Sequence, residues 1–401
     1  MFPPLGDRGL IIIEMINHLF KMIWKRRKTN FLIMLEVFVA FIILFAVSSL
    51  SVYSYKNYIQ PSGIRTDNVW AVYVNYNSFD DSLNKQNGTL IEQKLKNFKE
   101  IESYSFGEGV FPYGNTHNNR GFIRNGKNFM VATMDADETY PSVLGLQLSE
   151  GTWFKNTDSI QVETPVIISQ MLKEELFGNE NALGKLIDEK AEGKKEKVVG
   201  VIEHFKHNSD FQSPENCIIT PFHGTKSSFL VKTTPSVSAE FEAEFAKSLR
   251  HLGKNWNIEI LHMDDMKAGC NEVYIVPLTI GFIVCGFLII NVAFGLFGVL
   301  FQNINRRRGE IGLRRAIGAT GRDISYQFVG EMAVLATFAI ALGVFFAVQF
   351  PILNVFDVAT SVYIWGIVLA VAAVYGLVLL CSWLPSRQAA AVHPAVALHE
   401  D

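Results

Sequence analysis

Residues 31–53 read FLIMLEVFVAFIILFAVSSLSVY, and Glu36 is the only charged residue among them. A helix of about 20 mostly apolar residues crosses a hydrocarbon core about 30 Å thick and satisfies its own backbone hydrogen bonds in lipid. The stretch therefore predicts a membrane-spanning helix. No small-residue cleavage site follows the short apolar run Leu10–Ile13. We therefore expect this span to be retained as an anchor.

Three further apolar blocks lie near the other end of the sequence, at Val273–Phe301, Ile324–Phe350 and Val362–Trp383. Each is long enough to cross a membrane. The predicted fold class is a membrane α-helical protein with four transmembrane helices and an α/β extracytoplasmic domain inserted between the first and second spans. The expected divisions of the chain are residues 1–30, 31–53, 54–272 and 273–401.

Lysines and arginines beside the spans predict the orientation. Basic clusters precede the first span and join the second to the third, whereas the turn at about 351–361 has no basic residue. With four crossings and a cytoplasmic N-terminus, every cluster falls in the cytoplasm and residues 54–272 fall outside. This outer segment holds 30 acidic and 23 basic residues, a net charge of −7, consistent with translocation. The prediction is therefore a multi-pass protein of the inner (plasma) membrane with both termini in the cytoplasm.

Residues 1–30 are interpreted as a cytoplasmic amphipathic segment. Apolar residues recur there at helical spacing with basic residues between them, as in a helix that lies on the inner membrane face. The alternative is that this stretch is only the flank of the first span. The apolar residues in question are Leu10, Ile13, Ile16, Phe20, Ile23 and Trp24.

The outer segment shows mixed α/β patterns. Val69–Tyr76 alternates as a strand, and Leu90–Ile101 has helical spacing. Near its end, Ser228–Thr233, Ala239–Leu252 and Ile258–Leu261 are predicted as strand, helix and strand. These two ends predict a split βαβ layer whose middle is an inserted β-rich subdomain. The strands expected in the insertion are Phe129–Met134, Pro165–Ile168 and Lys197–Val201.

No catalytic residue and no metal ligand is predicted in the outer segment. His204 and His207 lie close together, but a metal site needs further convergent ligands. The run Gly178–Leu186 has one residue too many between its glycines, and Leu186 stands where a phosphate loop requires Ser or Thr. The chain is therefore predicted to lack a nucleotide site of its own and not to be an enzyme.

Two of the four cysteines, Cys217 and Cys270, lie in the outer segment, and Cys285 and Cys381 lie in apolar blocks. A disulfide forms only where the compartment is oxidising. The sequence leaves open whether Cys217 and Cys270 pair or remain thiols.

The loop between the second and third spans, residues 305–323, reads NRRRGEIGLRRAIGATGRD. Within it, Glu310–Ile317 is predicted to form a short helix with apolar residues on one flank and arginines on the other. Gly318 and Gly321 are expected to break this helix before the next span. Such a helix would dock on a soluble partner and pass force into two spans. The alternative is a positive cluster that only fixes topology, and the residues alone leave both readings open.

The chain resembles the MacB/FtsX family of ABC transporter permeases. The signature is EIGLRRAIGAT (310–320) followed by Gln327, Phe328 and Glu331. One departure is His204, which stands where many relatives carry Asp. The further stretches that resemble the family are ETYPSVLGLQLSEGTWF (138–154), TPVIISQMLKEELFGNENALGKLI (164–187), KVVGVIEHFKHNS (197–209) and the tail WLPSRQAAAVHPAVALHE (383–400).

This resemblance implies that the loop contacts a cytoplasmic ABC ATPase subunit. ATP and Mg²⁺ would bind that partner, and this chain would bind no cofactor. We expect the chain to form a homodimer or a heterodimer with a similar permease, and to meet a periplasmic or outer-membrane component. No nucleic-acid partner is expected. The residues it assigns to ATPase coupling are Arg306, Arg307, Arg308, Glu310, Ile311, Gly312, Arg314, Arg315 and Gly318.

The function that this resemblance implies is transmission of ATP hydrolysis into motion of the outer domain, to export or extract a substrate. One alternative is an FtsX-like regulator of cell-envelope hydrolases. Another is a membrane-anchored receptor or enzyme that uses the outer domain alone. No residue identifies the substrate.

Two acidic residues fall inside predicted spans. Such residues usually face protein or water, because a charge in lipid is costly. Glu331 lies about two helical turns past the loop, so we expect it to pair with a loop arginine. Glu36 is nearer the inner face and is expected to snorkel or to pair with Arg27 or Lys28.

Overall fold

The computed structural model describes residues 27–390, except 109, 115, 117, 125, 156–162, 188–194, 236 and 254, and leaves out the side chains of 27–30 and 384–390. The predicted amphipathic segment therefore lies almost wholly outside the described residues, as does most of the predicted closing motif. Contacts divide the chain into two units. The helical unit is Met1–Ser54 with Val276–Asp401, and the outer unit is Tyr55–Ile275.

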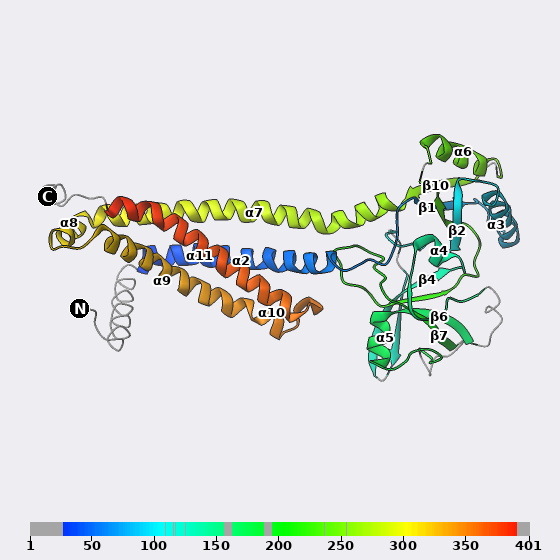
Figure 1. Ribbon diagram of the computed structural model, residues 1–401, viewed down its shortest axis with the longest axis horizontal. Coiled ribbons are helices and arrows are strands. Elements are labelled where there is room, and N and C mark those ends of the chain that lie inside the picture. Colours follow the sequence, from blue (N-terminus) through cyan, green and yellow to red (C-terminus); the bar gives the residue numbers. More distant parts are fainter. Residues whose placement is uncertain are drawn as a thin grey trace. The chain divides into compact units, whose positions relative to one another are not determined.

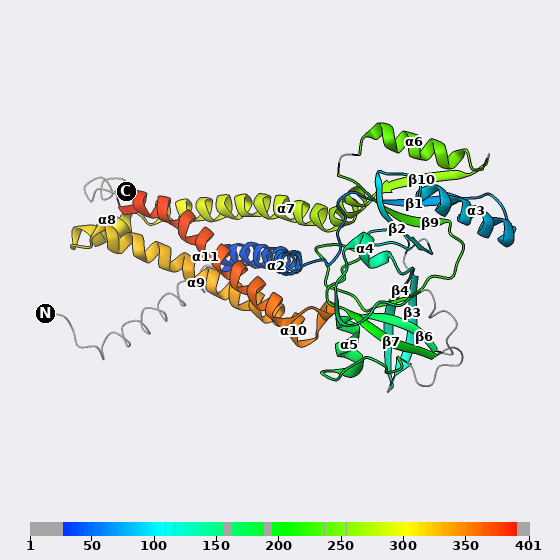
Figure 2. The same cartoon turned by 45° about the vertical axis from the view of Figure 1, so that its right-hand side comes forward.

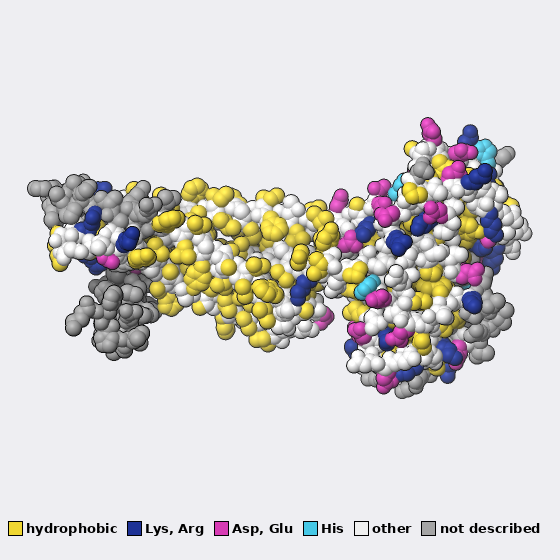
Figure 3. All heavy atoms as spheres, in the orientation of Figure 1, with side chains coloured by type: hydrophobic (Ala, Val, Ile, Leu, Met, Phe, Trp, Pro, Cys, Tyr) yellow, Lys and Arg dark blue, Asp and Glu magenta, His cyan; other side chains and the backbone are white. Residues whose placement is uncertain are grey.

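Within the part of the chain that the structure describes, four helices are long and apolar enough to cross a membrane, which confirms the four predicted spans. The second of these helices begins at Met263, well before the predicted Val273, because its first turns are polar and hydropathy does not detect them. Figure 3 shows hydrophobic side chains over the spanning helices and charged side chains of both signs over the outer unit. The helices are α2 (Arg27–Tyr58), α7 (Met263–Arg306), α8 (Arg308–Ala316), α9 (Gly321–Ala347), α10 (Gln349–Ile352), the 3-10 turn η2 (Val355–Asp357) and α11 (Thr360–Ala390) (Figure 1).

Small residues allow the spanning helices to approach closely. Helices α9 and α11 pack along each other (Figure 2). On α9, a Cβ added to Gly343 would lie 2.2 Å from the ring of Phe41 in α2. On α11, a Cβ at Gly366 would lie 2.1 Å from the hydroxyl of Ser49 in α2. Glycine at these positions thus sets close helix contacts of the kind that stabilise membrane bundles.

One mixed sheet forms the centre of the outer unit. Its order is β10-β1-β9-β2-β4-β8-β6-β7-β5, with β3 paired to β4. Its strands are β1 (Val69–Asn75), β2 (Ile101–Gly107), β3 (Asn118–Arg124), β4 (Lys127–Ala136), β5 (Leu148–Gly151), β6 (Glu163–Ser169), β7 (Lys195–Ile202), β8 (Cys217–Pro221), β9 (Ser228–Thr233) and β10 (Asn257–His262).

The predicted split layer and its insertion are parts of this same sheet. The antiparallel group β10-β1-β9-β2 joins the inserted strands through a single residue pair between β2 and β4, Gly107 with Ala136. Helices α3 (Asp81–Leu95) and α6 (Ala239–Arg250) contribute to a core with Trp70 of β1. The other helices of the unit are α4 (Tyr140–Leu144) and α5 (Gln170–Phe177).

The predicted helix at Leu90–Ile101 is wrong at both ends. Helix α3 begins earlier, because the side chain of Asp80 accepts hydrogen bonds from the backbone N–H groups of Ser82 and Leu83 and so caps the N-terminus. It ends at Leu95, and Ile101 already begins β2. The strands predicted around Val69, Phe129, Pro165, Lys197, Ser228 and Ile258, and the helix after Ala239, are confirmed with shifts of a few residues at their ends.

The structure answers the question about the cysteines, since all four are free thiols. Cys217 is buried in β8, and burial raises the pKa of its thiol. The Cys270 thiol donates a hydrogen bond to the carbonyl oxygen of Tyr113 at 3.3 Å. No disulfide is therefore needed to account for the fold of the outer unit.

Candidate functional site

Helix α8 lies between the end of α7 and the start of α9 (Figures 1 and 2). Gly318 ends it in a left-handed conformation with φ +106°, as predicted. Its N–H donates to the carbonyl of Arg315, and the N–H of Ala319 donates to that of Arg314, which is the Schellman pattern. Gly321 does not break the helix, contrary to our expectation. It is the first residue of α9, whose N-terminus is capped by Thr320 and Asp323.

A nearly buried ion pair fixes this loop to α9. Arg307 lies between α7 and α8, and its Nη1 is 2.9 Å and 3.1 Å from the two carboxylate oxygens of Glu331. The two side chains are 10% and 13% exposed. The predicted pairing of Glu331 with a loop arginine is thus confirmed. Removing one partner of such a pair leaves a desolvated charge, which costs about 3–5 kcal/mol.

Further contacts extend the pair into a network. The amide of Gln327 donates to Glu331 at 3.2 Å and accepts from Arg314 at 2.5 Å. Arg314 also lies 2.6 Å from Glu310, and Arg307 lies 3.5 Å from the same carboxylate. The network therefore adds charged contacts between α8 and α9 to the burial of Ile311 in the apolar core of the helical unit.

The apolar residues of α8 were predicted to lie together on one flank, and this is wrong, because Ile311 is buried whereas Leu313 and Ile317 are exposed. Ile311 and Gly312 are buried in the helical unit. Leu313 is 53% exposed, and Ile317, just after the helix, is 79% exposed. The anchored loop thus presents an apolar pair outward. Tyr326 of α9 is also exposed, and no charge pattern in the sequence marks it.

The other residues predicted to couple to the ATPase lie in the same loop as the exposed Leu313 and Ile317. Arg306, Arg308, Glu310 and Gly318 are exposed, and Arg315 is half-buried. The loop therefore offers basic groups next to apolar ones, a combination suited to an acidic, partly apolar protein surface.

Glu36 behaves differently from Glu331. It is half-buried in α2, and a Cβ added to Gly295 of α7 would lie 2.6 Å from its Oε2. Among the described residues it has no hydrogen bond or ion pair. The side chains of Arg27 and Lys28, its predicted partners, lie outside the described residues. The missing side chain at Gly295 is what gives the carboxylate room between the two helices.

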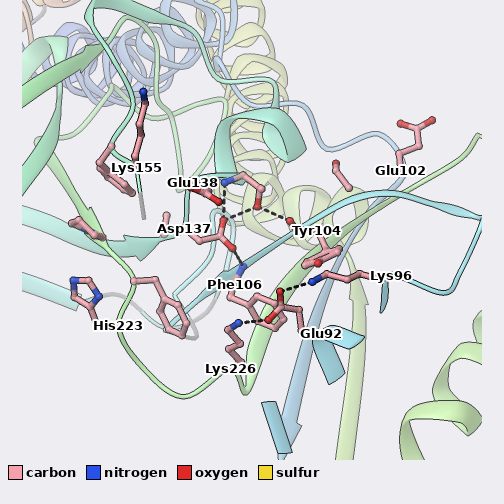
Figure 4. A pocket seen from close by; sticks show the side chains of 16 residues that line it. Glu92, Lys96, Glu102, Tyr104, Phe106, Asp137, Glu138, Lys155, His223 and Lys226 are labelled. Carbon is pink, nitrogen blue, oxygen red and sulfur yellow. Dashed lines mark hydrogen bonds and ion pairs between the residues drawn. The ribbon is translucent and has the colours of Figure 1, made fainter. Parts of the chain in front are cut away.

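The outer unit contains a cavity of about 550 Å³ that no pattern in the sequence predicts (Figure 4). Its residues come from α3, β2, the turn after β4, the segment after β5 and the β8–β9 connection. Aromatic side chains line it together with charged ones. The aromatic residues are Tyr104, Phe106, Phe154 and Phe222. These residues lie far apart in the sequence, so no local motif marks the cavity.

Most charges around the cavity have partners. Glu92 contacts both Lys226 and Lys96, and these two lysines lower the pKa of its carboxyl group, Lys226 most strongly. Asp137 accepts hydrogen bonds from the Ser105 hydroxyl at 2.6 Å and from the Phe106 N–H at 2.7 Å, and two more from Thr139. Asp137 therefore joins β2 to the turn after β4. An aromatic cavity with paired charges at its edge is suited to an amphipathic ligand.

The two histidines do not converge. His204 is exposed beside Glu203, whereas His207 is buried against the ring of Phe205 and lies 3.7 Å from Glu215. In the part of the chain that the structure describes, no group of three or more His, Cys, Asp or Glu residues is placed to hold a metal ion.

Comparison with known proteins identifies both parts of the chain. A MacB-like periplasmic core domain model matches residues 31–248, and an FtsX-like permease C-terminal model matches residues 282–394.

Individual relatives are distant. The uncharacterized ABC transporter permease YknZ of Bacillus subtilis is 25% identical over 220 residues, which cover 52% of this chain and 54% of that protein. The macrolide export ATP-binding/permease protein MacB of Bradyrhizobium diazoefficiens is 25% identical over 329 residues, covering 77% and 48%. The chain thus spans about half the length of these curated relatives. The crystal structure of the periplasmic region of MacB from Actinobacillus actinomycetemcomitans covers 53% of this chain and 97% of that one, with 20% identity and a TM-score of 0.36.

Proposed function

The chain belongs to the family of ABC transporter permeases that combine a MacB-like periplasmic core domain with an FtsX-like permease domain, and on this premise we propose that it is the membrane subunit served by a separate cytoplasmic ATPase. The ATPase would bind ATP and Mg²⁺ and would dock on the loop that contains α8. Its conformational cycle would move α7 and α9, and through them the outer unit, so that a substrate is exported or extracted.

The observation that carries this proposal is the construction of the loop. The Arg307–Glu331 pair fixes α8 to α9, while Leu313 and Ile317 remain exposed. A loop that only set topology would need its positive charges but neither a buried ion pair nor an outward apolar pair. A rigid helix with an apolar tip can both bind a partner and transmit its displacement.

Four spans are few for a conduit, so the proposal includes a dimer, either of this chain or with a similar permease. A further periplasmic or outer-membrane component would meet the outer unit. The FtsX-like regulator is not favoured, since the match to the MacB-like core domain covers most of the outer unit. The substrate class stays open.

The proposal places α8 in the cytoplasm and the η2 turn outside, on the basis of the basic clusters. Single cysteines at Leu313 or at the exposed Phe356 of η2, in a chain without its native cysteines, test this placement. A membrane-impermeant maleimide added to intact spheroplasts should label Phe356→Cys at once and Leu313→Cys only after the membrane is opened. The reverse order would contradict the orientation.

Co-purification tests the function itself. The tagged chain is extracted in mild detergent, and its companions are identified by mass spectrometry. A soluble ABC ATPase recovered in equal stoichiometry is the expected result. Recovery of the chain alone, under conditions that keep a control transporter intact, would instead favour a receptor or enzyme that uses the outer unit by itself.

A further inference from the structure

A single segment of the outer unit, Lys206–Gln212, contacts both helices through which the chain enters and leaves that unit. The segment lies between β7 and β8. Helix α2 enters the unit with its last turn, and the first turns of α7 leave it. Any movement that the spanning helices transmit along the chain must pass through these two helical ends. Their attachment to one segment is therefore mechanically significant.

Lys206 holds the end of α2. Its side chain is 2% exposed, yet its ammonium group donates to backbone carbonyls of Asn57 and, at 3.3 Å, of Gln60, and to that of Asp210 at 3.4 Å. Carbonyls at a helix C-terminus lack intrahelical donors and attract cations. Burial lowers the pKa of this lysine, because the charged ammonium group loses its hydration. An apolar side chain of the same length would avoid this desolvation. The position is thus suited to binding carbonyls rather than to filling space.

Two neighbouring contacts reinforce this attachment to α2. The side-chain amide of Asn57 donates to the carbonyl of Phe211 at 3.2 Å. The ring of Phe211 stacks on that of Tyr58, with centroids 5.2 Å apart. The last turn of α2 is therefore held by a charge, a hydrogen bond and an aromatic contact.

The same segment holds one face of α7. Asn271 accepts hydrogen bonds from the Ser209 hydroxyl at 2.8 Å and the Asp210 N–H at 3.0 Å, and donates to the Asp210 carboxylate at 3.1 Å. Lys267 lies 3.1 Å from that carboxylate, and the Tyr274 hydroxyl donates to Gln212 at 2.9 Å. Lys267, Asn271 and Tyr274 are spaced four and three residues apart, so they line one side of the helix.

We propose that Lys206–Gln212 is the joint through which displacement of α2 and α7 is passed to strands β7 and β8, with Lys206 and Asn271 as its positioning residues. This inference rests on the proposed function, because it assigns the route by which ATPase-driven motion enters the outer unit. Lys206 fixes the joint to α2, and Asn271 fixes it to α7. Loss of either side chain therefore weakens the attachment of the segment to one of the two helices.

Hydrogen–deuterium exchange on the full chain in nanodiscs, bound to its co-purified ATPase, tests the joint. Deuterium uptake is compared between the nucleotide-free state and the state trapped with ATP and vanadate. In the wild type, peptides of β7 and β8 should change their uptake on trapping. In Lys206→Met and in Asn271→Ala this change in uptake should be about fivefold smaller. A factor of about five corresponds to the lower end of typical coupling free energies between two sites. Lys206→Arg should retain most of it, and the exposed Lys99→Met should behave as wild type.

The outcomes separate the joint from the proposed function. A wild-type response that persists in both Lys206→Met and Asn271→Ala overturns the joint and leaves the proposed function intact. A wild type without any response on trapping overturns both. If Lys206→Met fails to fold, Asn271→Ala decides alone. That substitution removes no charged group, and the Asp210 carboxylate keeps its ion pair with Lys267.

Discussion

Replacing Leu313 and Ile317 together by aspartate is expected to abolish co-purification of the ATPase with this chain. Both side chains are exposed in the isolated chain, so burial against a partner would remove apolar surface from water. Full burial of one such side chain contributes about 1.5–3 kcal/mol. Losing both would weaken association by at least about a hundredfold, since each 1.4 kcal/mol is a factor of ten. Titration of the purified ATPase against nanodisc-embedded chain measures the change.

A matched control uses exposed apolar residues elsewhere in the helical unit. Ile352 of α10 and Phe356 of η2 are also exposed, and the proposed orientation puts them outside the cytoplasm. Their double aspartate variant should bind the ATPase as the wild type does. If both double variants bind equally well, α8 is not the docking element. Reversing the charges of Arg314 and Arg315 is a less specific test, because Arg314 also holds α8 through Glu310 and Gln327.

Arg307→Met is expected to detach α8 from α9 at a cost of about 3–5 kcal/mol, because Glu331 would remain nearly buried without its cation. The α8 sequence itself would be unchanged. Amide exchange over Arg308–Ala316 should rise strongly, and ATPase binding should weaken even though Leu313 and Ile317 are present.

The second partner supplies the control for this prediction. Glu331→Met alone should be similarly destabilising, whereas Arg307→Met with Glu331→Met should recover much of the loss, because two apolar side chains leave no unpaired charge. A double-mutant cycle on the exchange rates gives the coupling energy. A coupling energy near zero would mean that the pair does not hold the loop.

Much of the outer unit followed from local pattern. Strands β1, β4, β6, β7, β9 and β10 were predicted because alternating or continuous apolar residues mark them. Strands β2, β3, β5 and β8 were missed. The sequence of β3, NNRGFIR, is mostly polar, since β3 pairs only with β4 and most of its side chains are exposed. A strand of this kind carries little periodic signal.

The parts of the site differ in the same way. Gly318 was predicted as a helix end because a left-handed cap is a local requirement that glycine meets. Gly321 carried the same signal, yet Thr320 and Asp323 made it the start of α9. That Glu331 needs a partner followed from its place in an apolar span. The identity of this partner depends on how α8 turns back onto α9. This turn brings Arg307, rather than another arginine of the loop, to Glu331.

The amino-acid sequence by itself determined the four spans and the membership of the permease family, because hydropathy over about 20 residues and a continuous motif are properties of adjacent positions. The tertiary structure decided which residues meet. The aromatic cavity gathers side chains from five separate segments of the chain. Asn57 and Asn271 lie near opposite ends of the sequence of the outer unit, and both contact the segment Lys206–Gln212. Such contacts depend on strand order and on helix direction, which no local pattern specifies.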